Sequence, residues 1–183
     1  MDKQPAIFLD RDGVIIENRA NYVRSWDDVD IYPQALRALA AIRHSHYKII
    51  MVTNQSAVGR GIISLAAAQA INERLLQIIA ATNGRIDDVF MCPHAPDEQC
   101  SCRKPQPGLL LQAAVRHNLN LSQSYMIGDA LTDLQAGLAA GVPNVILLRT
   151  GRGQQQAQLP AAASLHPITL FDTLIDAFQH IQG

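Results

Sequence analysis

The stretch Ala6-Ile7-Phe8-Leu9-Asp10-Arg11-Asp12-Gly13 constrains the fold of this chain more than any other. Four consecutive apolar residues are typical of a short strand that is buried on both faces, as in a parallel sheet. The run ends at Asp10 and Asp12, and Gly13 follows, which can adopt backbone conformations that other residues resist. Ligands of open α/β sheets bind outside the carboxyl ends of the strands, so the two carboxylates are expected at a functional site. The alternative is a strand that ends in an ordinary solvated turn, because Asp and Gly are common turn residues.

Length and composition indicate one ordinary soluble domain. The chain has 183 residues, of which 48% are hydrophobic and 17% charged, and its formal net charge is −1. This charge gives no reason to expect a nucleic acid or an anionic membrane as a partner. The apolar runs fall well below the roughly 18–20 residues that cross a bilayer, and Met1 to Pro5 shows no sign of a signal peptide. We therefore expect a cytoplasmic, monomeric protein in which residues 1–183 form a single domain.

Three later apolar segments are expected to be strands that end, like the first, in polar residues. Lys48–Val52 runs into Thr53-Asn54-Gln55-Ser56, Val89–Met91 runs into a cysteine cluster, and Tyr125–Ile127 stops at Gly128-Asp129. A fifth strand is predicted at Val145–Leu148. Because parallel strands bring their carboxyl ends to the same edge of a sheet, the polar residues that follow them should converge.

Helical patterns separate these strands. Ser64 can cap a long helix that reaches about Asn83, and Gly141 can end a short helix that begins at Ala130. Strand and helix alternate throughout, so we expect an α/β fold, a three-layer Rossmann-like parallel sheet with helices on both faces. Residues 14–32 lack helical spacing and are interpreted as an excursion beside the site, since a loop of this length is more often functional than idle. The other expected helices run from Pro33 to about Ser45, from Pro107 onward and from about Leu170 to Ile181, and residues 159–167 are expected to cross the surface irregularly.

The residues at the predicted strand ends suit phosphoryl transfer. They supply two carboxylates, a hydroxyl–amide pair and a further carboxylate, and Lys104 lies just past the cysteine cluster. A transferred phosphoryl group is anionic and must be neutralised by a cation and by N–H or O–H donors. Mg²⁺ prefers hard oxygen ligands and keeps several waters, so a couple of aspartates suffice to hold it. For Lys104 the alternative is a solvated surface lysine.

In this order, the residues resemble the four motifs of the haloacid dehalogenase (HAD) superfamily. The matching elements are Asp10-x-Asp12-Gly13, Thr53, Lys104 and Gly128-Asp129-x-x-x-Asp133, which together span the chain from the first strand to the fifth. The resemblance implies a HAD-like fold. It also implies that Asp10 attacks phosphorus and becomes an aspartyl-phosphate, and that Asp12 protonates the leaving oxygen and then activates water. Thr53 and the adjacent backbone N–H would hold phosphate oxygens, and Lys104 would balance the charge of the nucleophile and the phosphate.

The resemblance also implies a catalytic Mg²⁺ site. Asp10, the carbonyl oxygen of Asp12, and Asp129 would bind the ion. Asp133 lies one helical turn after Asp129 and has two open roles: it orients a metal-bound water behind the ligands, or it caps the helix.

The cysteine cluster predicts a second metal. All three cysteines of the chain lie between residues 92 and 102, together with a histidine. Cys92, His94, Cys100 and Cys102 form a Cys₃His set, which suits a tetrahedral structural Zn²⁺. The alternative is a group of free thiols on a loop. This zinc loop has few apolar residues to pack, so metal binding must supply its folding energy. Its end leads directly to Arg103 and Lys104, and zinc is therefore expected to hold these cations in place.

The zinc loop and the lack of a large cap domain resemble two groups within the superfamily. One group removes the 7-phosphate of D-glycero-D-manno-heptose 1,7-bisphosphate, on the route to nucleotide-activated heptose, and the other hydrolyses histidinol phosphate. The short Cys-x-His-x₅-Cys-x-Cys spacing resembles the histidinol group. The sequences Tyr22-Val23, Thr53-Asn54-Gln55-Ser56, Arg60-Gly61 and Arg149-Thr150-Gly151 resemble the heptose group. Relatives often carry Arg or Lys where this chain has Ala130, which puts one substrate contact in doubt.

Charge favours the bisphosphate. A second anionic end would suit the arginines of the predicted mouth, which are Arg19, Arg60, Arg103, Arg149 and Arg152, whereas Glu17, Asp27 and Asp28 would suit the cationic amine of histidinol phosphate. The preferred interpretation is a phosphatase of a small-molecule sugar phosphate. Its substrate-binding residues are predicted to be Arg11, Arg19, Tyr22, Thr53, Asn54, Gln55, Ser56, Arg60, Arg103 and Lys104. A catalytically silent, zinc-stabilised binding module and a phosphotransferase with an acceptor other than water are the remaining alternatives.

Overall fold

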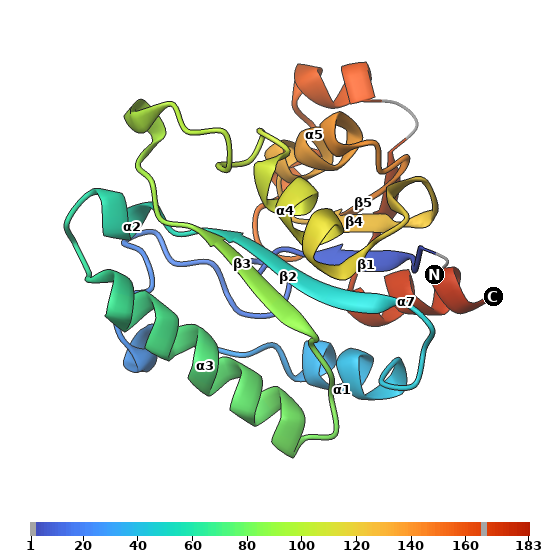
Figure 1. Cartoon of the computed structure of the whole chain (residues 1–183), viewed down its shortest axis with the longest axis horizontal. Coiled ribbons are helices and arrows are strands. Elements are labelled where there is room, and N and C mark those ends of the chain that lie inside the picture. The colour runs from blue at the N-terminus through green and yellow to red at the C-terminus, as the bar shows by residue number, and fades with distance from the viewer. Residues whose placement is uncertain (1–2, 166–167) are drawn as a thin grey trace.

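Six parallel strands form the sheet at the centre of this computed structural model, which describes residues 3–165 and 168–183 (Figure 1). The order across the sheet is β3-β2-β1-β4-β5-β6, so the direction of strand addition reverses between β1 and β4. The strands are β1 (Ala6–Leu9), β2 (Lys48–Asn54), β3 (Asp88–Cys92), β4 (Tyr125–Gly128), β5 (Asn144–Leu148) and β6 (Thr169–Phe171).

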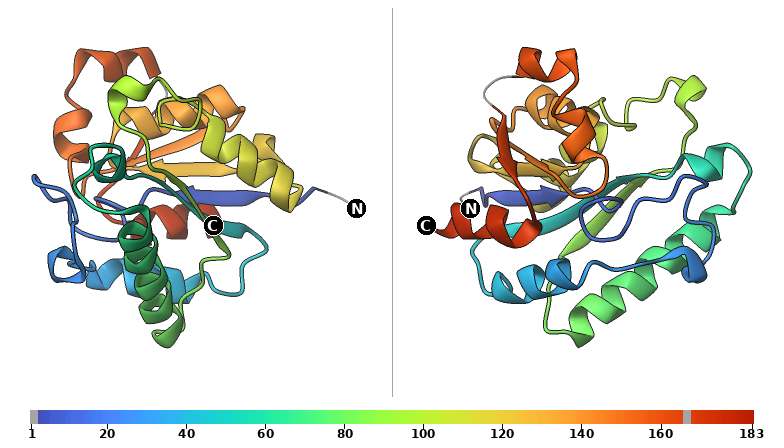
Figure 2. Two further views of the ribbon diagram at one scale, coloured as in Figure 1. Left: turned by 60° about the vertical axis from the view of Figure 1, so that its left-hand side comes forward. Right: turned by 180° about the vertical axis from the view of Figure 1, so that it is seen from behind.

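Helices cover both faces of the sheet (Figures 1 and 2). On one face lie α1 (Pro33–Ala41), α3 (Leu65–Ala81) and α7 (Leu174–Gln182). The other face is covered by α4 (Gly108–His117) and α5 (Leu131–Ala140). The predicted three-layer α/β fold is therefore confirmed. The shorter elements are α2 (Ser56–Gly59), α6 (Gly153–Gln156) and the 3₁₀ turns Trp26–Asp28, Pro96–Glu98, Leu121–Gln123 and Pro160–Leu165.

Each strand contributes to two hydrophobic cores because its side chains alternate between the faces. In β1, Ile7 and Leu9 pack into the core beneath α1, α3 and α7, while Ala6 and Phe8 pack into the core beneath α4 and α5. All four side chains are at most 1% exposed. Burying a side chain such as Leu or Phe is worth about 1.5–3 kcal/mol, so this uninterrupted apolar run is anchored on both sides.

Helix ends follow the predicted caps where a capping residue is present. The Ser64 hydroxyl accepts a hydrogen bond from the Ala67 N–H at 3.0 Å, and Gly141 ends α5 with a φ of +88°. The first predicted helix was extended too far, because α1 ends at Ala41 and its chain then turns toward β2.

The C-terminal region departs from its prediction in one respect. Residues 169–171 form β6 at the sheet edge instead of the first turn of the last helix. Helix α7 begins at Leu174 because Thr173 and Asp176 form a capping box, in which Asp176 Oδ2 accepts the Thr173 N–H at 2.9 Å. The end of the predicted surface crossing (residues 166–167) lies outside the described residues. Residues 1–2, at the start of the segment where no signal peptide is expected, also lie outside them.

The strand order places Asp10 and Asp129 side by side. They follow β1 and β4, the two neighbouring strands between which the order reverses, and this is where open α/β sheets bind ligands. Asp10 N donates to Ile127 O at 3.0 Å, which extends the pairing of the two strands to the site. Among the described residues, no helix is both long enough and apolar enough to span a bilayer.

Candidate active site

A cavity of about 630 Å³ opens at the carboxyl ends of the strands. It brings together most of the residues that the sequence predicts, and the excursion after β1 forms part of its wall. Thr53 and Asp129 are fully buried and do not line it. The predicted residues that line it are Asp10, Asp12, Arg19, Tyr22, Asn54, Gln55, Ser56, Arg103, Lys104 and Asp133, and it also contains Asn18, Ala20, Val23, Thr132 and Arg152.

Lys104 is the buried cation of the site. Its Nζ lies 2.8 Å from Asp10 Oδ1, 2.8 Å from Asp133 Oδ1 and 2.8 Å from the carbonyl oxygen of Val52. Burial opposes the charge of Lys104, but the two carboxylates prevail and raise the pKa of its ammonium group above the usual value. Lys104 is only 3% exposed, so the interpretation as a solvated surface lysine is wrong.

Asp10 lies in an environment that disfavours its negative charge. Burial raises its pKa to about 6, the charges of Asp133 and Asp12 act in the same direction, and Lys104 opposes them. A carboxylate with this pKa would be stabilised by a further positive charge. The arrangement therefore leaves Asp10 poised for a cation or for a proton.

Three buried carboxylates form an acidic cluster near the end of β4. One oxygen each of Asp10, Asp129 and Asp133 lies within 4.8 Å of the others, and the pKa of Asp129 is raised by burial and by Asp10, against the effect of Arg152. Gly13 and Gly151 have positive φ values of 84° and 56°, and a Cβ at either position would collide with the Asp129 carboxylate. Hard oxygen donors in a cradle that only glycine leaves open fit a divalent cation such as Mg²⁺.

Asp133 has two observed contacts. Its Oδ2 accepts a hydrogen bond from the Ala130 N–H at 3.1 Å at the start of α5, and its Oδ1 pairs with Lys104. Of the two open roles, the helix-capping role is confirmed. The predicted role behind the metal ligands stays a prediction.

Arg152 is a site residue that the list of substrate contacts missed. Its backbone N–H donates to Asp129 Oδ2 at 2.8 Å and its Nη2 lies 3.3 Å from Asp129 Oδ1. The signal was present in the arginine of Thr150-Gly151-Arg152, directly after β5. Asn18 was also missed; its amide donates to Asp129 Oδ2. Its position in the excursion after β1 carries no sequence signature.

The prediction that Arg11 binds substrate does not agree with its position. Side chains alternate in direction at a strand end, and Arg11 points beneath the cavity that Asp10 and Asp12 line. It is 1% exposed, and its guanidinium donates to both oxygens of Asp12 and to Asn72 on α3. The contacts make Arg11 part of the support beneath Asp12.

The residues after β2 are engaged with the protein. The Asn54 amide binds both backbone groups of Lys104, and Gln55 Nε2 donates to Thr53 Oγ1 at 2.8 Å and to Asp12 Oδ2 at 3.0 Å. Thr53 thus lies directly behind the cavity wall, where its hydroxyl already has one partner. Ser56 begins α2 at the cavity edge.

The five arginines of the predicted mouth divide into two sets. Arg19, Arg103 and Arg152 line the cavity. Arg60 is exposed after α2 and does not line it, and Arg149 pairs with Asp172 at 2.6 Å. Both lie outside the cavity because their side chains leave the loops on the solvent side. Glu17, Asp27 and Asp28, the acidic residues of the excursion after β1, are not among the residues that line the cavity.

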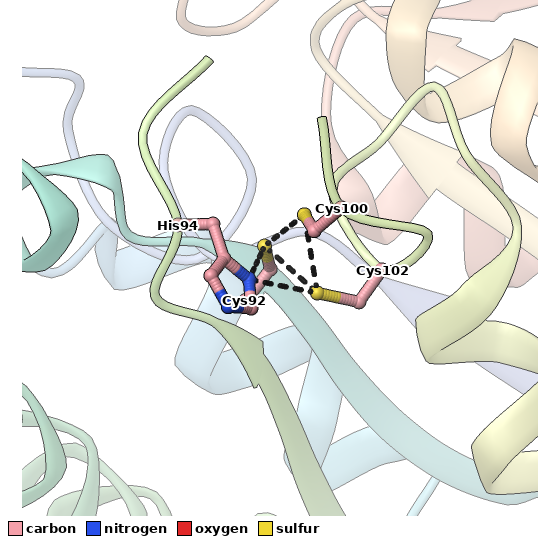
Figure 3. Close-up of side chains that lie close together, drawn as sticks. All are labelled: Cys92, His94, Cys100 and Cys102. Carbon is pink, nitrogen blue, oxygen red and sulfur yellow. Dashed lines mark hydrogen bonds between the residues drawn. The ribbon is translucent and has the colours of Figure 1, made fainter. Parts of the chain in front are cut away.

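The cysteine cluster is assembled as the spacing predicts (Figure 3). Cys92 at the end of β3 lies 3.1 Å from Cys102 and 3.5 Å from Cys100, measured between sulfur atoms. His94 Nδ1 lies 3.2 Å from the Cys102 sulfur. In a tetrahedral zinc site with bonds of about 2.3 Å, ligand atoms lie about 3.7 Å apart. One ligand atom from each of the four residues lies within 4.8 Å of the others, so the set fits one zinc ion.

The fold and the site together define a phosphoryl-transfer enzyme of the HAD-like class. A sequence model described as HAD-hydrolase-like matches residues 101–177. A D-glycero-beta-D-manno-heptose-1,7-bisphosphate 7-phosphatase from Bordetella bronchiseptica is 38% identical over 149 residues, which cover 81% of this chain and 83% of the relative. The phosphatase of the same description from Helicobacter pylori strain J99 is 40% identical over 144 residues, or 78% of this chain and 82% of the relative. The chain belongs to this family of heptose-bisphosphate phosphatases.

Solved structures agree. The D,D-heptose 1,7-bisphosphate phosphatase of B. bronchiseptica, solved in complex with magnesium and phosphate, matches with a TM-score of 0.89 at 32% identity and covers 97% of this chain and 98% of its own. The corresponding phosphatase from Burkholderia thailandensis matches with a TM-score of 0.73 at 28% identity and covers 98% of this chain and 99% of its own. The chain is therefore a phosphatase with the fold of these enzymes.

Proposed function

We propose that this phosphatase removes the 7-phosphate of D-glycero-beta-D-manno-heptose 1,7-bisphosphate through a phosphorylated Asp10. The observation that carries the proposal is the position of Lys104 Nζ, 2.8 Å from Asp10, on a side chain that is buried but lines the cavity. A carboxylate attacks a phosphate ester only where nearby cations screen their mutual repulsion. The names of the relatives supply the substrate.

In the first half-reaction, an oxygen of Asp10 forms a bond to phosphorus. The bond between phosphorus and the sugar oxygen breaks, and its electron pair stays on that oxygen. The sugar oxygen takes a proton from the carboxyl group of Asp12, which becomes a carboxylate. Lys104 balances the negative charge that gathers on Asp10 and the phosphoryl group. We assign the phosphoryl oxygens to Thr53 and the backbone N–H groups that follow it.

In the second half-reaction, Asp12 takes a proton from a water molecule, whose oxygen attacks phosphorus. The bond between phosphorus and Asp10 breaks, its electron pair returns to the Asp10 carboxylate, and inorganic phosphate leaves. Asp12 is suited to both steps because it lines the cavity, two residues from Asp10, while Arg11 and Gln55 hold its carboxylate.

We assign Mg²⁺ to Asp10, Asp129 and the carbonyl oxygen of Asp12. The ion supplies positive charge to the phosphoryl oxygens and to the buried carboxylates. The magnesium in the B. bronchiseptica phosphatase supports this assignment, as does the donor set of the acidic cluster. We assign structural Zn²⁺ to Cys92, His94, Cys100 and Cys102, where the loop that it closes leads to Arg103 and Lys104.

The charge of the cavity wall supports a bisphosphate over histidinol phosphate. Arg19, Arg103 and Arg152 line the cavity, whereas Glu17, Asp27 and Asp28 do not. Arg19 pairs with Asp30 and Arg152 with Asp129, so Arg103, whose guanidinium donates to the His94 carbonyl, is the residue that we assign to a second phosphate. A cationic amine would find no carboxylate there besides those of the acidic cluster and Asp12, among the described residues that line the cavity.

A substrate panel tests the proposal. Heptose 1,7-bisphosphate, fructose 1,6-bisphosphate and histidinol phosphate are compared by kcat/KM with Mg²⁺ present. We expect the heptose bisphosphate to exceed histidinol phosphate by at least about 100-fold, because its second phosphate contributes charge-assisted hydrogen bonds. It should also exceed fructose 1,6-bisphosphate, whose second phosphate is held at a different position by a different sugar ring. A higher value for histidinol phosphate would overturn the substrate assignment. No turnover of any phosphate ester would favour a silent binding module, and transfer to an added alcohol in place of water would favour a phosphotransferase.

A matched pair of arginine variants sharpens the test. Arg103→Ala should raise KM for the bisphosphate at least about 10-fold and leave KM for a monophosphate much less changed. Arg149→Ala is the control, since Arg149 pairs with Asp172 outside the cavity.

A further inference from the structure

Arg11 and Asn72 form a buried support beneath Asp12. Arg11 Nε and Nη2 donate to the two oxygens of Asp12 at 3.1 and 3.2 Å, and Arg11 Nη1 donates to Asn72 Oδ1 at 2.8 Å. Arg11 is 1% exposed and Asn72 is 5% exposed, and neither lines the cavity. The Arg11 guanidinium is already bound to Asp12 and Asn72 through all three of its nitrogens. The Asp12 side chain is 21% exposed and does line the cavity.

Asn72 lies where an apolar residue would be expected. It is on the buried face of α3, between Ile71 and Leu75, and these neighbours belong to the hydrophobic core. A buried amide is costly unless it is hydrogen-bonded, so packing alone does not account for it. Its oxygen binds Arg11, and its nitrogen lies 3.6 Å from the sulfur of Met91 on β3. The side chain is thus fixed from two sides.

The contacts of Arg11 use the geometry that distinguishes arginine from lysine. Two parallel N–H groups bind both carboxylate oxygens and thereby fix the plane of the carboxylate, whereas a lysine acts as a point charge. Asn72 Oδ1 accepts a hydrogen bond from Nη1, the third nitrogen of the guanidinium. Gln55 adds one more hydrogen bond to Asp12 Oδ2 at 3.0 Å.

We propose that Arg11 and Asn72 are positioning residues that act through Asp12: they orient its carboxyl group toward the leaving oxygen of the substrate. The inference rests on the proposed function, in which Asp12 gives a proton to the sugar oxygen as the bond to phosphorus breaks. It assigns to α3 a part in catalysis, although α3 contributes no residue to the cavity wall among those described.

The rate of Asp10 phosphorylation with different leaving groups distinguishes a positioning role from a substrate contact and from a general structural role. A sugar alkoxide is a poor leaving group and needs the proton of Asp12, whereas p-nitrophenolate leaves without one. A misdirected Asp12 should therefore slow phosphorylation of Asp10 by a sugar phosphate and spare phosphorylation by p-nitrophenyl phosphate. Loss of a substrate contact would weaken binding instead, and a general structural defect would slow both reactions alike.

The experiment measures phosphoryl-enzyme formation by rapid acid quench in the Mg²⁺-loaded enzyme, with heptose 1,7-bisphosphate and with p-nitrophenyl phosphate. The variants are Arg11→Lys, which keeps a buried positive charge, and Asn72→Leu, which keeps the branched outline of the side chain and removes its hydrogen-bonding atoms. We expect about 10- to 100-fold slower formation from the sugar phosphate and less than about threefold change with p-nitrophenyl phosphate, with little change in substrate affinity. Asn72→Leu should slow phosphoryl-enzyme formation less than Arg11→Lys, because Asn72 contacts Arg11 and does not contact Asp12 directly.

Ser124→Ala is the control. Ser124 is fully buried and hydrogen-bonds to the backbone of β1 at its amino end, so its loss should affect stability without any dependence on the leaving group. Equal slowing of both substrates in the Arg11 and Asn72 variants would overturn the inference, as would weaker substrate binding at an unchanged rate. If the wild-type enzyme hydrolyses the bisphosphate but forms no phosphoryl-enzyme, the proposed mechanism itself falls, and this result is seen before any variant is compared.

Discussion

Asn54 and Lys104 are joined by two hydrogen bonds between the amide side chain of one and the backbone of the other. Asn54 Nδ2 donates to the Lys104 carbonyl at 3.0 Å, and the Lys104 N–H donates to Asn54 Oδ1 at 3.1 Å. The two residues are far apart in the sequence, at the end of β2 and after the cysteine cluster. The contact fixes the backbone of Lys104 while its side chain extends to Asp10.

Asn54→Ala should therefore impair catalysis as well as stability. We expect kcat to fall at least about 10-fold because Lys104 is displaced, with KM less affected. The free energy of unfolding should fall by about 1–2 kcal/mol for the two lost hydrogen bonds. Asn144→Ala is the matched control, because Asn144 donates to the Ser124 carbonyl at 3.1 Å, outside the cavity. A normal kcat in Asn54→Ala would show that the amide does not position Lys104.

Removal of zinc should lower the catalytic activity, because the zinc loop leads directly to Arg103 and Lys104. We expect one zinc ion per chain by elemental analysis, and Cys102→Ser should lose it. The same variant should lose at least about 10-fold in kcat/KM, because the loop orders the two cations. Its circular dichroism should retain the features of the folded sheet, because most residues of both cores come from the strands and helices, although Cys92 belongs to one core and Cys102 packs against it.

Ser101→Ala tests the zinc prediction in the same loop. Ser101 is exposed and is not one of the four ligands, so both zinc content and activity should persist. A fully active enzyme that is purified without zinc would contradict the proposed role of the ion.

Magnesium affinity should depend on pH through Asp10. Burial raises the pKa of Asp10 to about 6, and a proton on this carboxyl group competes with the metal. Below about pH 6 the apparent dissociation constant for Mg²⁺ should rise about 10-fold for each pH unit, and above about pH 7 it should be nearly constant.

The raised pKa of Asp10 also determines whether the stability of the fold rises or falls with pH. A carboxyl group whose pKa is higher in the folded state stabilises the fold at low pH, and this contribution is lost as the pH rises through about 6. Saturating Mg²⁺ should therefore raise Tm most at pH 7–8 and least near pH 5. Calorimetry at several pH values checks both trends, and Asp10→Asn should remove them. A pH-independent affinity in the wild type would show that Asp10 is not a ligand.

Much of the site was predictable because most of its functional residues lie within short, contiguous segments of the sequence. Asp10, Asp12 and Asp129 follow apolar strands, and parallel strands bring their carboxyl ends together. The Cys92–Cys102 segment holds its four candidate ligands within one loop, so no long-range contact had to be inferred. Lys104 follows that loop directly.

The features that the sequence did not reveal depend on the direction of a side chain or on contacts between residues that are distant in the sequence. Arg11 lies between two cavity residues, and only its side-chain direction shows that it points to α3 instead. Asn72 is 61 positions away and carries no motif. Strand β6 was missed because three residues at a sheet edge gain their structure from pairing with β5, which no local pattern reveals.

The central claim is that Asp10 is transiently phosphorylated, and acid quenching of the Mg²⁺-loaded enzyme during turnover tests it most directly. Peptide mass spectrometry should find one phosphoryl group on the peptide that contains Asp10, in an acyl-phosphate linkage that hydroxylamine cleaves. Asp10→Asn should show no such label and should lose at least about 10³-fold in kcat, because the nucleophile is absent while its shape is kept. Turnover of the bisphosphate with no label on Asp10, together with substantial activity in Asp10→Asn, would contradict the account.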